Sequence, residues 1–185
     1  MTAVDFVGRV IDALNQLGIP FMLVGSFSSN LYGIPRSTKD ADFVVQLDPS
    51  KFQPLVAALT PEFDVDPQVA FETITSTTRY RMKHRATAFM VELFELSADA
   101  HDQSRFARRA AITFAGRPAY AASAEDVVVT KLRWSLHGQR AKDVDDVRNV
   151  LALQAGNLDL GYIRGWCDPH GTRSLLEQIL ASSTP

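Results

Sequence analysis

The order of the hydrophobic patterns along the chain decides most about its fold. The short apolar and β-branched runs that we assign to strands all lie before residue 122, whereas the segments after Ser123 are assigned to helices. Strands and helices that occupy separate parts of a chain are typical of α+β proteins and not of repeated βαβ units. We therefore expect a mixed sheet of about five strands followed by a helical C-terminal third.

The individual segments are assigned from periodicity and from capping residues. Strands are expected over 21–24, 41–47, 78–85 and 88–96, with a short pair over 111–114 and 118–121. Helices are expected over 3–17, 28–32, 48–59, after 66–67, from 123, and over 142–154, 159–167 and 173–181. The domain prediction is an α/β core of residues 1–122 with a helical subdomain of residues 123–182 packed on it as one compact unit.

Composition excludes several classes of protein. A chain of 185 residues has the length of one domain, and its formal charge of −2 gives no general attraction to nucleic acid or to an anionic membrane. Its one cysteine, Cys167, cannot form an intramolecular disulfide, and the four histidines lack the spacing of zinc ligands. The N-terminus lacks the pattern of a signal peptide, and no apolar run has the length of a membrane span. We expect a cytoplasmic protein without a membrane segment.

Two aspartates, Asp40 and Asp42, stand at the head of the apolar run 41–47. Residues two apart in a strand project from the same face, so the two carboxylates are expected side by side. Like charges at that separation repel each other unless a cation lies between them, and Mg²⁺ takes carboxylate oxygens while keeping positions for water and phosphate. The alternative is an ordinary turn at the strand entry, with Asp40 capping the loop.

A Gly-Ser pair ends the preceding apolar run. Gly25 and Ser26 follow the expected strand 21–24 and come before a helix, where exposed N–H groups suit a phosphate. Glycine lets the backbone approach the anion closely, and the serine hydroxyl can donate a hydrogen bond to it. The phosphate-binding patterns G-x-G-x-x-G and G-x-x-x-x-G-K-[ST] do not occur in the sequence.

The succession of strand, Gly25-Ser26, short helix and Asp40-Ala-Asp42 resembles the signature of the polymerase-β-like nucleotidyltransferase superfamily. In that signature a hydrophobic residue precedes Gly-Ser, hydrophobic residues flank Asp-x-Asp, and a third acid lies on a later strand. Glu92, in the middle of the expected strand 88–96, matches the third acid. Many members of the family carry Asp there, so the longer side chain of Glu92 is a departure that bears on the metal geometry.

The helical part adds to this resemblance, which spans residues 21–151. Lys131, and the segment from Arg140 through Asp143 to Asp146, resemble the lysine and the R-x-K-D-x-x-D segment of small toxin-type nucleotidyltransferases, the AbiEii group. The stretch from Arg36 to Asp42 looks like that group's R-x-[ST]-x-D-x-D region.

The resemblance implies an enzyme that uses Mg²⁺ or Mn²⁺ to transfer an NMP from an NTP to a hydroxyl of RNA, a protein or a small molecule. The implied metal ligands are Asp40, Asp42 and Glu92, which together with Lys131 are the implied catalytic residues. The implied nucleotide-binding residues are Gly25, Ser26, Arg36, Lys131, Asp143 and Asp146. A toxin-like role with an antitoxin or regulatory partner is implied as well. The alternative, which the glutamate at position 92 keeps open, is an inactive nucleotide- or RNA-binding module with the same fold.

Two further features lie outside that resemblance. In the strand 78–85, the basic residues Arg79, Arg81, Lys83 and Arg85 alternate with Tyr80, Met82 and His84, so four charges share one face. That face is either a solvated outer surface or a basic wall for triphosphate or an RNA backbone. A second Asp-x-Asp, at 64–66, lacks a preceding Gly-Ser, and its second aspartate is expected to cap a helix that starts at residue 67.

Overall fold

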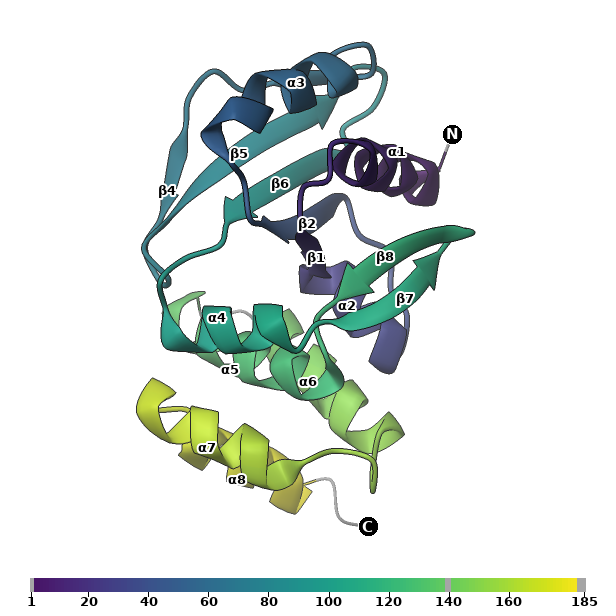
Figure 1. Cartoon of the computed structure of the whole chain (residues 1–185). Helices are drawn as coiled ribbons and strands as arrows, with labels where there is room; N and C mark the ends of the chain where they lie inside the picture. The colour runs from purple at the N-terminus through teal and green to yellow at the C-terminus, as the bar shows by residue number, and fades with distance from the viewer. Residues whose placement is uncertain (1, 139–140, 183–185) are drawn as a thin grey trace. The chain divides into compact units, whose positions relative to one another are not determined.

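Figure 1 shows the computed structural model of the chain, which describes residues 2–138 and 141–182. The internal packing of the chain divides it into two compact units. The first comprises Met1–Phe27 and Ser37–Ala122, and the second comprises Ser28–Arg36 and Ser123–Pro185. The segment 28–36 thus belongs to the helical unit although it lies early in the sequence. That the two units form one compact body stays a prediction.

The first unit is built on a mixed sheet of eight strands. The strands are β1 (Phe21–Val24), β2 (Asp40–Val45), β3 (Phe63–Val65), β4 (Ala70–Glu72), β5 (Thr77–His84), β6 (Met90–Glu95), β7 (Ala110–Phe114) and β8 (Arg117–Ala121). Their order is β3-β5-β6-β2-β1-β8-β7, and β4 pairs with β5. β2 runs parallel to β6 and antiparallel to β1. The α+β class and the mixed sheet are confirmed, whereas the number of strands exceeds the predicted five.

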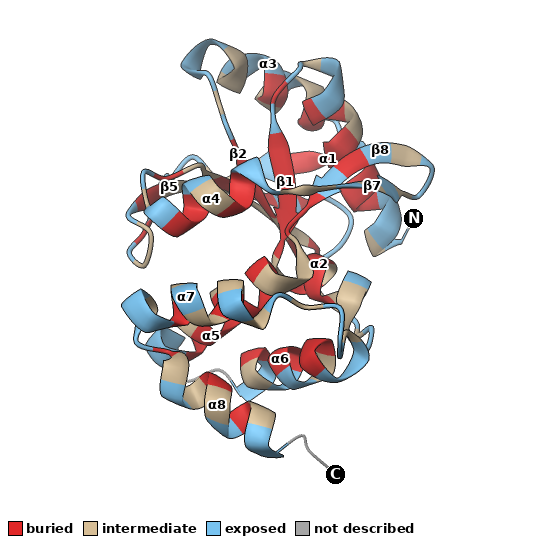
Figure 2. Ribbon diagram, turned by 60° about the horizontal axis from the view of Figure 1, so that its bottom comes forward, coloured by how far each residue is buried: buried red, intermediate tan, exposed pale blue. Residues whose placement is uncertain are grey.

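One face of this sheet carries the main hydrophobic core. Residues of β1, β2, β5 and β6 that alternate along their strands pack against α1 (Ala3–Gln16) and α3 (Pro49–Leu59). Phe21, Leu23 and Phe43 are almost fully buried in this core, and Figure 2 shows β1 as buried along its length. Because side chains alternate across a strand, the residues between these, including both aspartates of β2, lie on the opposite face.

Capping residues explain where the helices of the first unit begin. The Asp48 side chain accepts a hydrogen bond from the backbone N–H of Ser50, and Pro49 occupies the first turn of α3, as the sequence predicts. The helix α2 (Gly25–Tyr32) begins at Gly25 itself, earlier than the predicted residue 28. A further helix, α4 (Ala100–Ala107), was not predicted, although Asp99 caps it through the N–H groups of His101 and Asp102.

The predicted helix after residues 66–67 is wrong. The region 63–72 instead contributes β3 and β4, which lie along β5. Asp66 accepts a hydrogen bond from the backbone N–H of Gln68, a local turn, and also from the Arg81 guanidinium at 2.7 Å. An aspartate before a proline suits a turn as well as a helix start, and here pairing with β5 favours the extended chain.

The second unit is helical, as predicted. It contains α5 (Ala124–Gly138), α6 (Ala141–Leu153), α7 (Leu160–His170) and α8 (Arg173–Ser182). Ser123 accepts a hydrogen bond from the Asp126 N–H and donates one to its carboxylate, which resembles the predicted capping box. α5 packs against α6 and α7, and α7 packs against α8. In the described parts of the chain, no helix has the length and hydropathy of a membrane span.

Candidate active site

The register of three neighbouring strands brings the predicted acids to one face of the sheet. Asp42 in β2 lies opposite Glu92 in the parallel strand β6, and Asp40 lies two residues earlier on the same face. Asp42 also lies opposite Val24, the last residue of β1, so its position adjoins the β1–α2 turn. All three acids belong to the first unit and are partly exposed. The geometry that sequence spacing predicted for Asp40 and Asp42 is therefore present.

Gly25 is held against the carboxylate of Asp42. Its φ of +63° lies in the left-handed region that side chains disfavour. A Cβ at Gly25 would lie 2.9 Å from Cγ of Asp42 and still closer to Oδ2. Only glycine therefore fits between the end of β1 and this aspartate. The next residue, Ser26, is buried in the first turn of α2.

This close approach predicts the effect of adding one methyl group. Gly25→Ala should lower the free energy of unfolding by about 1–3 kcal/mol through backbone strain, and should also push the Asp42 carboxylate aside. Gly116→Ala is the matched control, because Gly116 has a φ of +80° but nothing within 4 Å of its Cβ position. Thermal unfolding should show a loss of stability in both variants, whereas binding of Mg²⁺-NTP should fall only in Gly25→Ala. Equal nucleotide binding by the two variants would contradict the assigned role of Gly25.

The other two acids have polar partners of their own. The hydroxyl of Thr38 donates a hydrogen bond to Oδ1 of Asp40, which orients that carboxylate at the strand entry. Thr38 is the threonine of the segment Arg36-Ser-Thr-Lys-Asp40, and its place two residues before the aspartate is the signal that could have identified this contact. Oε2 of Glu92 lies 3.5 Å from a guanidinium nitrogen of Arg79 in the neighbouring strand β5.

The basic residues of β5 are mostly paired with acids, which changes the prediction of a basic wall. Arg81 binds Asp66 at 2.7 Å and Arg85 binds Asp64 at 2.9 Å, both along the edge of the sheet. Paired in this way, their charges are locally balanced. Lys83 is exposed at the start of the β5–β6 hairpin. Of these residues, Arg79 has the contact nearest to the candidate site.

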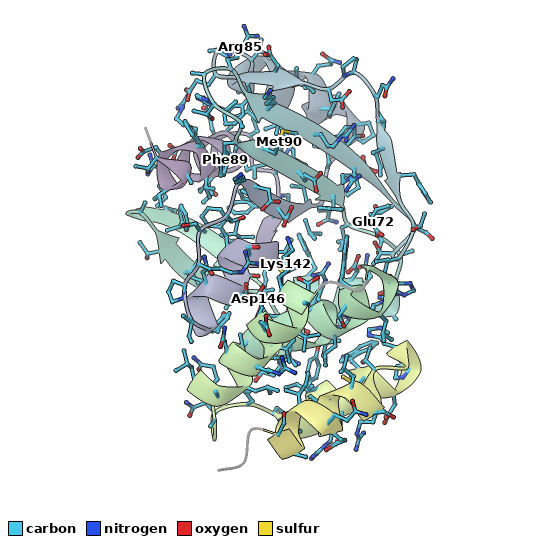
Figure 3. All side chains as sticks on the ribbon, turned by 180° about the vertical axis from the view of Figure 1, so that it is seen from behind. Glu72, Arg85, Phe89, Met90, Lys142 and Asp146 are labelled. Atoms are coloured by element: carbon cyan, nitrogen blue, oxygen red, sulfur yellow. The ribbon has the colours of Figure 1, made fainter. Side chains whose placement is uncertain are left out.

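A second polar cluster lies within the helical unit. The ammonium group of Lys131, on α5, lies 2.8 Å from Asp143 and 2.9 Å from Asp146, one turn apart on α6. Arg36 donates two hydrogen bonds of 2.9 Å to Asp146, and Ser29 donates one of 3.4 Å. The two aspartates and the lysine have 3%, 5% and 10% of their side-chain surface exposed. Figure 3 labels Asp146 on α6.

Charge balance in this cluster determines the ionisation of Asp146. Burial acts to raise its pKa, but the hydrogen bonds and charges of Arg36 and Lys131 outweigh burial, so the pKa is lowered from its ordinary value. Asp143 contacts Lys131 through Oδ1, and its Oδ2 is buried without a hydrogen-bond partner among the described residues. Lys131 therefore contacts both aspartates. Sequence spacing gave no signal for Ser29.

The remaining residues of the R-x-K-D-x-x-D segment contribute less. Arg140 lies outside the described residues, and Lys142 is exposed on α6 (Figure 3). Lys131, Asp143, Asp146 and Arg36 belong to the second unit, whereas the three acids of the sheet belong to the first. A role for the second group in nucleotide binding stays a prediction.

The acids of the sheet suit a metal that arrives with a substrate. Within the described residues, no group of three acidic, histidine or cysteine side chains could hold a metal by itself. Mg²⁺, however, is commonly held by one or two carboxylates together with substrate phosphates and water. Asp40 and Asp42 on one face, beside the glycine turn that starts α2, supply such a donor set. The residues therefore fit Mg²⁺ bound with a nucleotide, and not an all-protein metal cage.

No protein-family model matches the chain, and no curated protein does. Among solved structures, ANT(2'')-Ia in complex with adenylyl-2''-tobramycin is similar with a TM-score of 0.65 and 13% identity, over 94% of this chain and 99% of that one. An antigenic nucleotidyltransferase-like protein from Paracoccidioides brasiliensis has a TM-score of 0.53 and 16% identity, over 95% of this chain and 91% of that one. The lincosamide antibiotic adenylyltransferase LnuA has a TM-score of 0.51 and 12% identity, over 83% of this chain and 98% of that one. At these identities the likeness shows the fold, which is that of nucleotidyltransferases.

Proposed function

Because the chain has the fold of nucleotidyltransferases, we propose that it transfers a nucleoside monophosphate from an NTP to an acceptor hydroxyl. The single observation that supports this most is the position of Asp42. Its carboxylate lies against Gly25 at the start of α2 and opposite Glu92 in β6. A turn whose N–H groups can bind phosphate therefore adjoins carboxylates that can bind a divalent cation.

In this proposal the residues divide three tasks, which are to hold the cation, to hold the phosphates and to accept a proton. Asp40 and Asp42 would hold Mg²⁺ or Mn²⁺, which when bound supplies positive charge against the triphosphate and the leaving oxygen. The backbone N–H groups at Gly25 and Ser26 would hold the β- and γ-phosphates. The hydroxyl oxygen of the acceptor attacks the α-phosphorus, the bond from that phosphorus to the pyrophosphate oxygen breaks, and Glu92, which would also complete the cation site, takes the hydroxyl proton.

The acceptor class is part of the proposal. The chain spans nearly the whole length of ANT(2'')-Ia, whose structure contains adenylyl-2''-tobramycin, and LnuA is described with lincomycin bound. The net charge of −2 and the ion pairs along β5 give little positive field for a long RNA. We therefore infer a small molecule with a free hydroxyl as the acceptor. A tRNA or protein hydroxyl, an antitoxin partner and the AbiEii-like subtype stay predictions from the sequence resemblance.

One contact favours a second candidate, an inactive nucleotide-binding module. Glu92, the third acid of the signature, is paired with Arg79, and a carboxylate that is held by a guanidinium is less available to a metal ion. If that pair persists when nucleotide binds, the chain would bind an NTP without turning it over.

Two measurements on the unmodified protein separate these candidates. Mg²⁺ with an NTP should raise the melting temperature above that with Mg²⁺ or NTP alone, since a ligand that binds the folded state stabilises it. Labelled pyrophosphate should then appear when a mixture of small hydroxyl-bearing acceptors, aminoglycosides among them, is added. Stabilisation without pyrophosphate release would favour the inactive module, and no stabilisation by any NTP would contradict both candidates.

A further inference from the structure

The pair of Arg79 and Glu92 is unlike the other ion pairs of β5. Arg79 lies opposite Phe94 and Arg81 lies opposite Glu92, so Arg79 reaches Glu92 along the diagonal between the two strands. The contact is 3.5 Å long, whereas Arg81 holds Asp66 at 2.7 Å. Charge-assisted hydrogen bonds are usually 2.7–2.9 Å long. Arg79 is therefore loosely held, while the neighbouring arginine is bound firmly to the sheet edge.

Most donors of Arg79 are left over for another anion. A guanidinium has five N–H donors, and among the described residues Arg79 donates one side-chain hydrogen bond, to Glu92. Its Nε–H is buried without a hydrogen-bond partner among them. The guanidinium carbon lies 5.8 Å from the ring centroid of Phe94, which stabilises the cation on this face of the sheet. The side chain keeps 27% of its surface exposed, so an anion can reach it.

The position of Arg79 decides which anion that would be. It lies on the same sheet face as Glu92 and Asp42, in the strand next to β6. In the nucleotide-free protein the guanidinium supplies part of the positive charge that these carboxylates need. A cation bound with a nucleotide would compete with Arg79 for Glu92, and would deliver phosphates to the same face.

We propose that Arg79 exchanges partners when nucleotide binds. In the free protein it neutralises Glu92, and in the complex it leaves Glu92 to the cation and binds the polyphosphate of the nucleotide. This proposal rests on the proposed function and adds to it a residue that links phosphate binding to release of the third acid. Arg79 would thus act first as a positioning residue for Glu92 and then as a phosphate ligand.

The exchange predicts opposite effects of one substitution on two ligands. Arg79→Gln removes the internal cation, so Mn²⁺ alone should bind about two- to fivefold more tightly, the range expected for a partly exposed ion pair. The same variant loses a charged phosphate ligand, so inorganic pyrophosphate with Mg²⁺ should bind roughly tenfold more weakly. Mn²⁺ binding can be followed by electron paramagnetic resonance and pyrophosphate binding by calorimetry. Arg79→Lys keeps the charge and should recover part of the pyrophosphate affinity.

Lys83→Gln is the matched control, because Lys83 has the same charge on the same face of β5 but lies opposite Met90 in β6 and Asp64 in β3, away from Glu92. It should change both affinities by less than about twofold, the effect of a screened charge at a distance. If Arg79→Gln weakens both ligands equally, or changes neither, the exchange is wrong while the proposed function stands. A wild-type protein that binds neither pyrophosphate nor any NTP would overturn the proposed function and the exchange together.

Discussion

Asp42→Asn is expected to reduce nucleotidyl transfer at least ~10²-fold, which corresponds to about 2.7 kcal/mol of transition-state stabilisation. The substitution keeps the shape of the side chain but removes the negative charge that would hold the cation. Its carboxylate is the one that adjoins Gly25 and lies opposite Glu92, so no neighbouring acid can take over the same position. Transfer is measured as release of labelled pyrophosphate in the presence of Mg²⁺, an NTP and the acceptor.

The stability of the same variant distinguishes a metal ligand from a structural residue. Without metal, the melting temperature of Asp42→Asn should stay the same or rise, because one of three acids on a single sheet face has been neutralised. Mg²⁺-NTP should then give little further stabilisation. Asp64→Asn is the control, since Asp64 is an aspartate of the same unit whose exposed pair with Arg85 lies on the sheet edge. An Asp42→Asn variant that melts lower in plain buffer, but responds fully to Mg²⁺-NTP, would contradict the metal-site assignment.

Local signals were sufficient for much of the fold. The helical stripe of α1, the Asp48-Pro49 start of α3 and the alternation of β5 and β6 are each set by neighbours in the sequence. The same is true of the acids, because strand period alone places Asp40 and Asp42 on one face. Their register with Glu92 depends on pairing between β2 and β6, which periodicity alone does not predict; the family resemblance implied only that Glu92 is a third metal ligand on a later strand.

The errors arose where distant pairing overrides local preference. Asp48-Pro49 and Asp66-Pro67 have the same local pattern, yet only the first starts a helix. Around Asp66-Pro67, β3 and β4 form backbone hydrogen bonds with the edge of β5, and the Arg81 guanidinium binds Asp66. The ion-pair partners of the basic residues of β5 were missed for the same reason, because they lie on another strand. Asp64 and Asp66 were visible in the sequence, but their position beside Arg85 and Arg81 requires the sheet.

The buried cluster of the helical unit shows how far spacing alone can go. Asp143 and Asp146 are three residues apart, so they share one face of α6, and both contact Lys131. The contribution of Arg36 to the same cluster could not be predicted, because it comes from a segment 110 residues earlier in the chain. Among the described residues, two cations contact Asp146 and one contacts Asp143, so the lysine has a structural role in this cluster.

Lys131→Met is therefore expected to lower the free energy of unfolding by about 3–5 kcal/mol, the usual cost of removing one partner from a buried ion pair. Methionine keeps much of the length of the side chain, so the decrease in the free energy of unfolding comes from the missing charge and not from a cavity. Arg36 still binds Asp146, but Asp143 is left with a buried and uncompensated carboxylate. Arg148→Ala, on the helix α6 that carries the two aspartates, is the control. Its pair with Asp145 has 52% and 64% of the side-chain surfaces exposed, and pairs of this kind contribute about 0–1 kcal/mol.

The pH dependence of unfolding gives this prediction a second readout. The lowered pKa of Asp146 contributes stability that is present above its ordinary value of 3.8 and is lost as the pH falls through the lowered value. In Lys131→Met one of the two cations that lower this pKa is gone while burial still raises it, so acid unfolding should begin at a higher pH. Adding Asp143→Leu should restore most of the stability at neutral pH, because the uncompensated charge is removed as well. A Lys131→Met protein that is as stable as Arg148→Ala, but fails to bind Mg²⁺-NTP, would instead make this lysine a nucleotide ligand.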